Sequence, residues 1–305
     1  MVVLSPWNFP VDEILLLALP ALAAGNTVIV KPSEVTPECG ALTVSLLASV
    51  LPPNTIQLAQ GDGKVGAQLV SHPNIHMVAM TGSSATGRCI LSNAAPNLKR
   101  IVLELGGKDP MVVFEDADMD KAAKDAVVYS LCNTGQVCCS VERIYVADSK
   151  KEDFEKRVVE YARNYKVGNG MDPEVTIGPL VSRLQRNHVA KQVDSALQQG
   201  AKLLLKSEVP ENETGSFYPV TVLSDVTSDM DVFRSETFGP VVAISTFDGS
   251  EEEAIRLAND TEYGLAGSVY SNDLGKAGRV ASRVCCGQVG INCWALEKMD
   301  VACPW

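Results

Sequence analysis

Two adjacent cysteines, Cys138 and Cys139, are the side chains of this sequence best suited to nucleophilic chemistry. They follow Asn133 and Gly135, which are typical of a polar loop that a substrate and backbone N–H donors can reach. A thiol of ordinary pKa, about 8.5, is ionised to a few per cent at pH 7. These features favour a catalytic role for one of the two cysteines without deciding which, and packing is the alternative. Packing is the predicted role of Cys39, Cys89, Cys285, Cys286 and Cys293.

Glu104 is the candidate general base. It lies near the end of an apolar strand, KRIVLEL, which stops at Gly106 and Gly107. A carboxyl group there is expected to be partly buried, and burial raises its pKa toward the values useful to a base. The two glycines allow another backbone or a ligand to approach closely. A structural ion pair is the alternative role for Glu104.

Two stretches could bind a nucleotide at the ends of predicted strands. In KPSE (31–34), Lys31 and Glu34 could bond ribose hydroxyls, and Glu34 would repel a 2′-phosphate. In TGSSATG (81–87), a strand leads into a helix whose N–H groups favour an anion, and Ser83 adds a hydroxyl. The alternatives are a solvated ion pair for the first stretch and a simple helix cap for the second.

A third stretch, GDGKVG (61–66), matches the G-x-G-x-x-G pattern of dinucleotide sites and lies between a strand and a helix. The acidic residue expected about twenty positions later is absent from the sequence. Direct phosphate contact and a tight strand–helix turn are therefore both open.

Composition excludes several classes of protein. The formal net charge of −11 disfavours nucleic acids and anionic membranes, because their phosphates would be repelled. The longest apolar run, ILLLALPALAA (14–24), is too short to span a bilayer and contains Pro20. Nine cysteines without a CxxC pair, and three histidines, indicate free thiols in a reducing compartment, with no disulfide framework and no metal site.

Strand-like and helix-like segments alternate along the chain, which predicts the α/β class with mainly parallel sheets. Gly106–Gly107 is the predicted domain boundary. The predicted strands cover 1–4, 27–30, 55–58, 76–80, 99–105, 111–114, 143–146, 202–205, 241–246, 267–270 and 288–292. The predicted helices cover 11–24, 36–48 with Thr36 as cap, 84–95, 118–132 with Asp118 as cap, 151–165, 182–199 and 251–259.

A series of motifs makes the chain resemble the aldehyde dehydrogenase superfamily over essentially its whole length. The motifs are SPWNFP (5–10), KPSE (31–34), TGS with Gly87 (81–87), LELGGK (103–108), GQVC (135–138), ETFGP (236–240) and YGL with a following strand (263–270). The resemblance implies two Rossmann-like open parallel sheets. Residues 1–105 would form a partial NAD-binding domain, and residues 106–305 a catalytic domain truncated at its C-terminal end. The chain is thus expected to be a fragment that lacks N- and C-terminal parts.

The resemblance also assigns roles. Cys138 would be the nucleophile, Glu104 the base and Asn8 an oxyanion donor. Lys31 and Glu34 would hold the adenosine ribose of NAD, and Ser83 the pyrophosphate. At the other end of the cofactor, Glu236 would hold the nicotinamide ribose and Phe238 would pack against the nicotinamide.

The activity implied is NAD-dependent, non-acylating oxidation of an aldehyde through a thioester, in the cytoplasm or an organelle, with a homo-oligomer expected for a full-length form. Near the nucleophile, Leu131 and Cys132 would line the pocket, and Trp294 and Trp305 its entrance, where their faces would favour a betaine-aldehyde-like cation. Two alternatives remain: a nucleotide-independent cysteine hydrolase using Cys138, Glu104 and Lys108, and an inactive homologue with a structural role.

Overall fold

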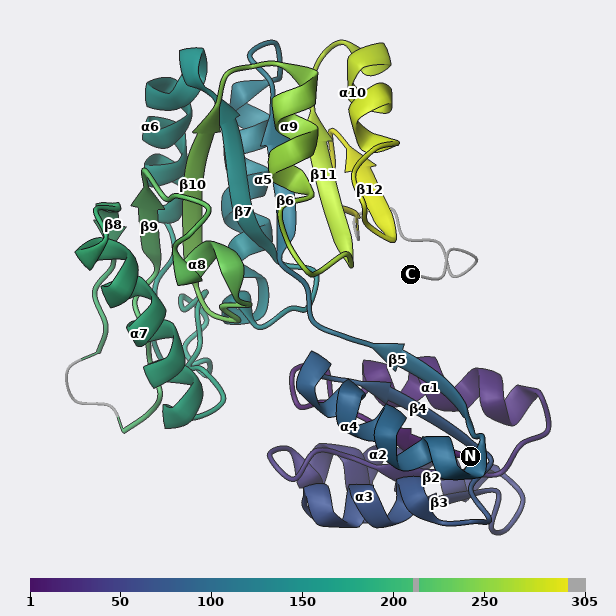
Figure 1. The fold of residues 1–305 in the computed structure, drawn as a ribbon. Coiled ribbons are helices and arrows are strands. Elements are labelled where there is room, and N and C mark those ends of the chain that lie inside the picture. The colour runs from purple at the N-terminus through teal and green to yellow at the C-terminus, as the bar shows by residue number, and fades with distance from the viewer. Residues whose placement is uncertain (211–213, 296–305) are drawn as a thin grey trace. The chain divides into compact units, whose positions relative to one another are not determined.

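The computed structural model describes residues 1–210 and 214–295, and it divides the chain into two compact units, Met1–Gly106 and Gly107–Trp305. Each unit is a sheet with helices on both faces, so the predicted α/β class is confirmed (Figure 1).

The first unit has five parallel strands in the order β3-β2-β1-β4-β5. The chain runs from β1 outward to β3, then returns to the other side of β1 for β4 and β5. The strands β1 and β4 therefore flank a topological switch point, where open α/β sheets bind ligands. The elements are β1 (Val2–Leu4), α1 (Asp12–Ala23), β2 (Val28–Lys31), α2 (Pro37–Val50), β3 (Ile56–Leu58), α3 (Gly63–Ser71), β4 (Met77–Thr81), α4 (Ser84–Ala94), the short 3-10 helix η1 (Ala95–Asn97) and β5 (Arg100–Glu104).

Alternating strand residues send apolar side chains to the two faces of this sheet. Val3 packs with α1 and α2 through residues such as Ile14 and Val44, whereas Val2 packs with α3 and α4 through Val70 and Ile90. Continuous apolar strands of this kind are what a parallel sheet covered on both faces requires.

The second unit has seven strands in the order β12-β11-β6-β7-β10-β9-β8, all parallel except β8, which runs antiparallel to β9. Its first half comprises β6 (Asp109–Val113), α5 (Met119–Leu131), the 3-10 helix η2 (Cys132–Gly135), β7 (Val141–Ala147), η3 (Asp148–Lys150), α6 (Lys151–Ala162), α7 (Arg183–Gln198) and β8 (Lys202–Lys206). Its second half comprises β9 (Thr221–Ser224), α8 (Asp231–Arg234), β10 (Val241–Phe247), α9 (Glu251–Ala258), β11 (Ala266–Tyr270), α10 (Leu274–Ala281) and β12 (Gln288–Ile291).

Both predicted helix caps occupy the predicted positions. Asp118 accepts bonds from the backbone N–H groups of Asp120 and Lys121, both at 3.1 Å, and so caps α5 as expected. Thr36 is the capping residue of α2, and Pro37 follows it in the first turn, where no N–H partner is needed. The Thr36 side chain itself makes no capping bond, and its buried hydroxyl has no hydrogen-bond partner among the described residues.

No helix in the described ranges combines the length and apolar character that crossing a membrane would require. Within residues 1–210 and 214–295 there is also no cluster of three or more histidine, cysteine or acidic side chains arranged to hold a metal ion.

Candidate active site

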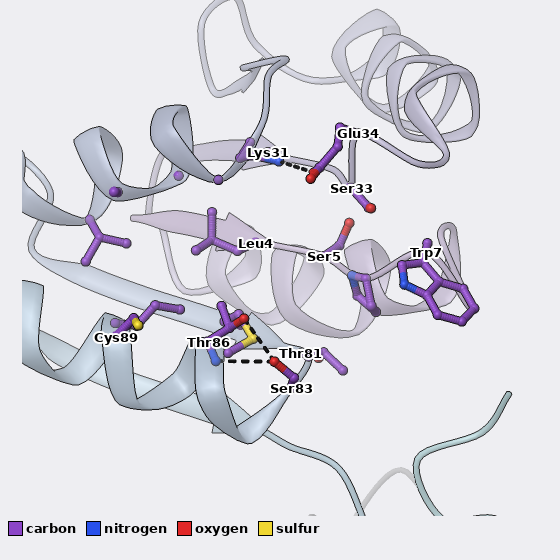
Figure 2. A pocket seen from close by; sticks show the side chains of 18 of the residues that line it. Leu4, Ser5, Trp7, Lys31, Ser33, Glu34, Thr81, Ser83, Thr86 and Cys89 are labelled. Carbon is purple, nitrogen blue, oxygen red and sulfur yellow. Dashed lines mark hydrogen bonds and ion pairs between the residues drawn. The ribbon is translucent and has the colours of Figure 1, made fainter. Parts of the chain in front are cut away.

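The first unit contains a pocket of about 360 Å³ at the carboxyl ends of β1, β2 and β4. Figure 2 shows its three sides: Lys31 and Glu34 on one, Leu4, Ser5 and Trp7 between, and Ser83 with Thr86 opposite. The pocket therefore occupies the switch point that the strand order creates. Three of the residues predicted to bind cofactor (Lys31, Glu34 and Ser83) line it together.

Lys31 and Glu34 form the end of this pocket that is predicted to hold the adenosine ribose. The Lys31 side chain is buried, donates to the carbonyl oxygen of Pro32 at 2.7 Å and lies 3.4 Å from Glu34 Oε2. Glu34 keeps 55% of its side chain exposed. A solvated pair at the surface, the alternative considered for these residues, is thus wrong for Lys31, because the lysine is fixed and the acid next to it remains accessible to a ligand.

The first turn of α4 forms the end of the pocket that is predicted to hold the pyrophosphate. Ser83 caps this helix, since its Oγ accepts from the backbone N–H of Thr86 at 3.2 Å. The first turn of a helix presents backbone N–H groups and a positive dipole end, and Gly82, Ser83 and Thr86 of this turn line the pocket. The cap and the candidate anion site are one structure, so the two interpretations of TGSSATG do not exclude each other.

The glycine-rich stretch 61–66 contributes less. Gly63 and Gly66 line the pocket, but Asp62 caps α3 by accepting from the N–H of Lys64 at 2.9 Å. That carboxylate lies where a phosphate would have to approach the helix. Gly61, at φ +144°, would bring a Cβ within 2.4 Å of Val65, so its conformation and space require glycine. This stretch is mainly the tight turn.

Two further pocket residues were not anticipated. Ser5 is buried, and its Oγ lacks a hydrogen-bond partner among the described residues, so a ligand hydroxyl could satisfy it. Cys89 is exposed and lines the pocket, and Cys39 and Cys285 are also exposed. The packing role predicted for these three thiols was wrong, because each lies on the solvent side of its segment.

Glu104 ends β5, where it is partly buried as predicted. Burial raises the pKa of its carboxyl, and the negative charge of Glu13 raises it further. Glu13 is held by Thr81, whose hydroxyl donates to Oε2 at 2.8 Å, and Thr81 pairs with Glu104 in the sheet. The charged neighbour of Glu104 in this unit is thus another carboxylate rather than the cation that an ion pair would need. Asn8 lies partly buried in the loop between β1 and α1.

In the second unit, an unusual backbone presents the cysteine pair. Asn133, Thr134 and Gly135 all have positive φ, at +49°, +62° and +73°. Gln136 closes this turn, because its Oε1 accepts from the N–H of Val181 at 2.9 Å and its Nε2 donates to the Asn133 carbonyl at 3.1 Å. Three successive left-handed residues are strained and persist only where surrounding structure fixes them, which is typical of functional loops.

The two cysteines are not equivalent. Cys138 is partly exposed, whereas Cys139 is buried with 1% of its surface accessible. A hydrogen bond with Cys138 and burial raise the pKa of the Cys139 thiol, which keeps Cys139 protonated. Cys139 is also fixed through its carbonyl, which accepts from the Trp294 indole at 2.8 Å. Since the thiolate is the reactive form and Cys139 stays protonated, the partly exposed Cys138 is the candidate nucleophile.

Glu236 and Phe238 lie in the segment 236–240, between α8 and β10. Burial raises the pKa of the Glu236 carboxyl to about 8, with a smaller contribution from the charge of Glu142. Glu236 Oε1 accepts from the N–H of Gly107 at 3.3 Å. Phe238 is held in a left-handed conformation at φ +52°.

The residues predicted for the substrate side have different surroundings. Leu131 is fully buried in the core of the second unit, whereas Cys132 is exposed. Trp294 stacks on Tyr129, with 4.5 Å between ring centroids, so one of its faces is already covered. Trp305 lies outside the described residues.

Sequence reasoning missed Glu142 and treated Lys108 only as a rival catalytic group. The two form a buried ion pair, with 2.5 Å between Lys108 Nζ and Glu142 Oε2. A signal was present in the sequence: Lys108 directly precedes the apolar strand β6, and Glu142 is the second residue of the apolar strand β7. Charged side chains in such buried surroundings are expected to be paired.

Comparison with known proteins agrees with this geometry. The sequence profile described as "Aldehyde dehydrogenase family" matches residues 1–305. Betaine aldehyde dehydrogenase of Bacillus subtilis (strain 168) is 41% identical over 294 residues, which cover 95% of this chain and 60% of that protein. The 2-aminomuconic semialdehyde dehydrogenase of Homo sapiens is 39% identical over 306 residues, or 98% and 63% of the two chains.

Solved structures give the same result. Betaine aldehyde dehydrogenase from Staphylococcus aureus in complex with NAD+ matches with a TM-score of 0.92 and 38% identity, over 96% of this chain and 59% of that one. Lactaldehyde dehydrogenase from Escherichia coli matches with a TM-score of 0.93 and 37% identity, over 98% and 63% of the two chains. The chain spans about 60% of the length of the curated relatives it matches. It belongs to the aldehyde dehydrogenase family.

Proposed function

We propose that this chain carries the NAD-binding and nucleophilic parts of an enzyme that oxidises an aldehyde to a carboxylic acid. The observation that carries the proposal is the switch-point pocket, in which Lys31, Glu34 and Ser83 lie with Ser5, whose hydroxyl has no partner in the described part of the chain. These groups fit NAD: a carboxylate and an ammonium suit ribose hydroxyls, and the first turn of α4 suits a pyrophosphate. NAD, when bound, supplies the acceptor for a hydride.

The protein groups have separate roles in this proposal. An aldehyde has no leaving group, so hydride can depart only after a nucleophile adds to the carbonyl carbon. The Cys138 sulfur would add, and the Asn8 amide and the Cys138 N–H would donate to the oxyanion. Losing one such donor typically costs about 3–4 kcal/mol of transition-state stabilisation.

Hydride loss would leave a thioester on Cys138. Glu104 would then accept a proton from a water molecule that attacks the thioester, which releases the acid and restores the thiol. The partial burial of Glu104 and its acidic neighbour support this role, because both raise the pKa of its carboxyl. At the nicotinamide end, Glu236 would hold the ribose and Phe238 would pack against the ring.

The substrate belongs to the same proposal. Relatives named betaine aldehyde dehydrogenase and aminoaldehyde dehydrogenase make a cationic aldehyde the first to test, beside simple aliphatic and aromatic aldehydes. The homo-oligomer expected for a full-length form is also a proposal.

The hydrolase alternative is weakened by Lys108. Its ammonium group is buried, forms an ion pair with Glu142 and donates a hydrogen bond to Thr237, so Lys108 is not available as a catalytic base. The separating experiment measures NAD binding by calorimetry and NADH formation with a panel of aldehydes. Saturable NAD binding with aldehyde-dependent NADH is expected. Ester hydrolysis without NAD binding would instead show a hydrolase, and neither activity would show an inactive homologue.

A further inference from the structure

The segment 236–240 carries both proposed nicotinamide-side residues, and one side chain outside the family motifs holds its backbone. Glu142, the second residue of β7, accepts from the backbone N–H of Thr237 through Oε2 at 2.8 Å and from that of Phe238 through Oε1 at 2.9 Å. Both oxygens of a single carboxylate are therefore used on two successive peptide groups. Glu142 is 6% exposed, so these bonds are shielded from water.

Lys108 completes the arrangement. Its ammonium group lies 2.5 Å from Glu142 Oε2 and donates to Thr237 Oγ1 at 2.9 Å. A buried carboxylate without a counter-charge would be costly, and Lys108 neutralises it while also binding the segment. Charge-assisted bonds of this kind are about twice as strong as neutral ones.

The carbonyl side of the segment is held separately. Gln185 on α7 donates through Nε2 to the carbonyl oxygens of Thr237 and Phe238, at 3.1 and 3.0 Å. Glu142 and Gln185 thus fix the N–H and C=O groups of the same two residues. This explains how Phe238, a non-glycine residue, stays at φ +52°, a conformation that is unfavourable for residues with a Cβ atom.

We propose that Glu142 is a positioning residue for the nicotinamide end of the cofactor site, acting through the backbone of Thr237 and Phe238. The inference rests on the proposed function, since Glu236 and Phe238 on either side of Thr237 are the residues assigned to that end. It predicts that removal of the Glu142 carboxylate increases the backbone motion of Phe238 and weakens the binding of NAD. Binding at the adenosine end, in the first unit, should be unaffected.

The test compares the 305-residue chain with Glu142→Gln, which retains the size but replaces one of the two accepting oxygens with an NH2 group that can only donate. Hydrogen exchange without ligand should become at least ten-fold faster at the amides of Thr237 and Phe238. NAD should bind about ten- to a hundred-fold more weakly, the range expected for lost charge-assisted bonds. ADP, which lacks both the nicotinamide and the ribose attached to it, should bind as before.

Two controls separate positioning from stability. Asp125→Asn removes a carboxylate of the same unit that bonds to Lys121 and Tyr270, and should leave both readouts unchanged. The double variant Lys108→Met with Glu142→Gln removes both charges, so a purely electrostatic role predicts recovery of NAD binding, whereas positioning predicts none. Unchanged amide exchange, equal weakening of NAD and ADP binding, or recovery in the double variant would each overturn the proposal. If the unaltered chain binds neither ligand, the proposed function fails, and amide exchange still decides whether Glu142 holds the segment.

Discussion

A Cβ added to Gly135 would lie 2.0 Å from the carbonyl oxygen of Gly239, so these two glycines bring the loop before Cys138 and the segment 236–240 together, backbone against backbone. A similar approach occurs at Gly107, whose added Cβ would lie 2.4 Å from the Cys138 carbonyl oxygen. The loop that carries Cys138 therefore packs against its neighbours at glycines that have no room for a side chain.

Gly135→Ala should destabilise the chain by more than about 2 kcal/mol, because a left-handed conformation and a backbone clash add together. Gly25→Ala is the matched control: Gly25 has φ +82°, but nothing lies within 4 Å of its added Cβ. Its cost should stay near the conformational term of about 1 kcal/mol. Urea unfolding of both variants checks this, and equal losses would show that the Gly239 contact does not matter.

Cys138→Ala should abolish NADH formation, whereas Cys139→Ala should retain most of it. The reason is that Cys138 is accessible, while a hydrogen bond and burial keep Cys139 protonated. Iodoacetamide labelling followed by peptide mapping should likewise modify Cys138 before Cys139. Equal loss of activity in the two variants would mean that the wrong cysteine has been chosen.

Glu104→Gln should separate the two halves of the proposed reaction. The first turnover needs only the thiolate, so a burst of NADH near one equivalent is expected. Steady-state turnover should then fall by about 10²–10⁴-fold, the usual contribution of a general base. Rapid mixing with an aldehyde measures both phases, and an unchanged steady-state rate would exclude Glu104 as the base.

Much of this site could be predicted from sequence, and the failures have physical causes. Lys31, Glu34 and Ser83 follow strand ends, and parallel strands bring their ends to one edge, so their meeting in one pocket was foreseeable. The residues themselves left open the choice between Cys138 and Cys139, and only the family resemblance favoured Cys138. The physical difference between them appears in the structure, because burial changes from one neighbour to the next after a loop whose backbone is left-handed at three positions. Glu142 was missed because its partners, Thr237 and Phe238, are nearly a hundred residues away along the chain.

Glu34→Ser should shift the cofactor preference from NAD toward NADP. The Glu34 carboxylate lies beside Lys31 at the end of the pocket predicted to hold the adenosine ribose, where it would repel a 2′-phosphate. Removing one like-charge contact of more than about 1 kcal/mol should raise the NADP to NAD ratio of kcat/KM about ten-fold. Ser83→Ala is the control, since a loss at the pyrophosphate should affect both cofactors equally. An unaltered chain that already prefers NADP would refute the assignment of Glu34.

Glu236→Gln should change how stability depends on pH. Burial raises the pKa of Glu236 to about 8, so between its ordinary range and pH 8 the folded chain keeps a proton that the unfolded chain has lost. The stabilisation from this group is complete at low pH and is lost as pH rises through about 8, with a slope of at most about 1.4 kcal/mol per pH unit. The glutamine side chain cannot ionise, so the variant should gain stability relative to the unaltered chain as pH rises from 5 to 8. Glu251→Gln serves as the reference, because Arg279 lowers the pKa of Glu251 and both of its states are ionised over this range. Urea unfolding at each pH gives the two differences, and parallel curves for the two variants would contradict a protonated Glu236.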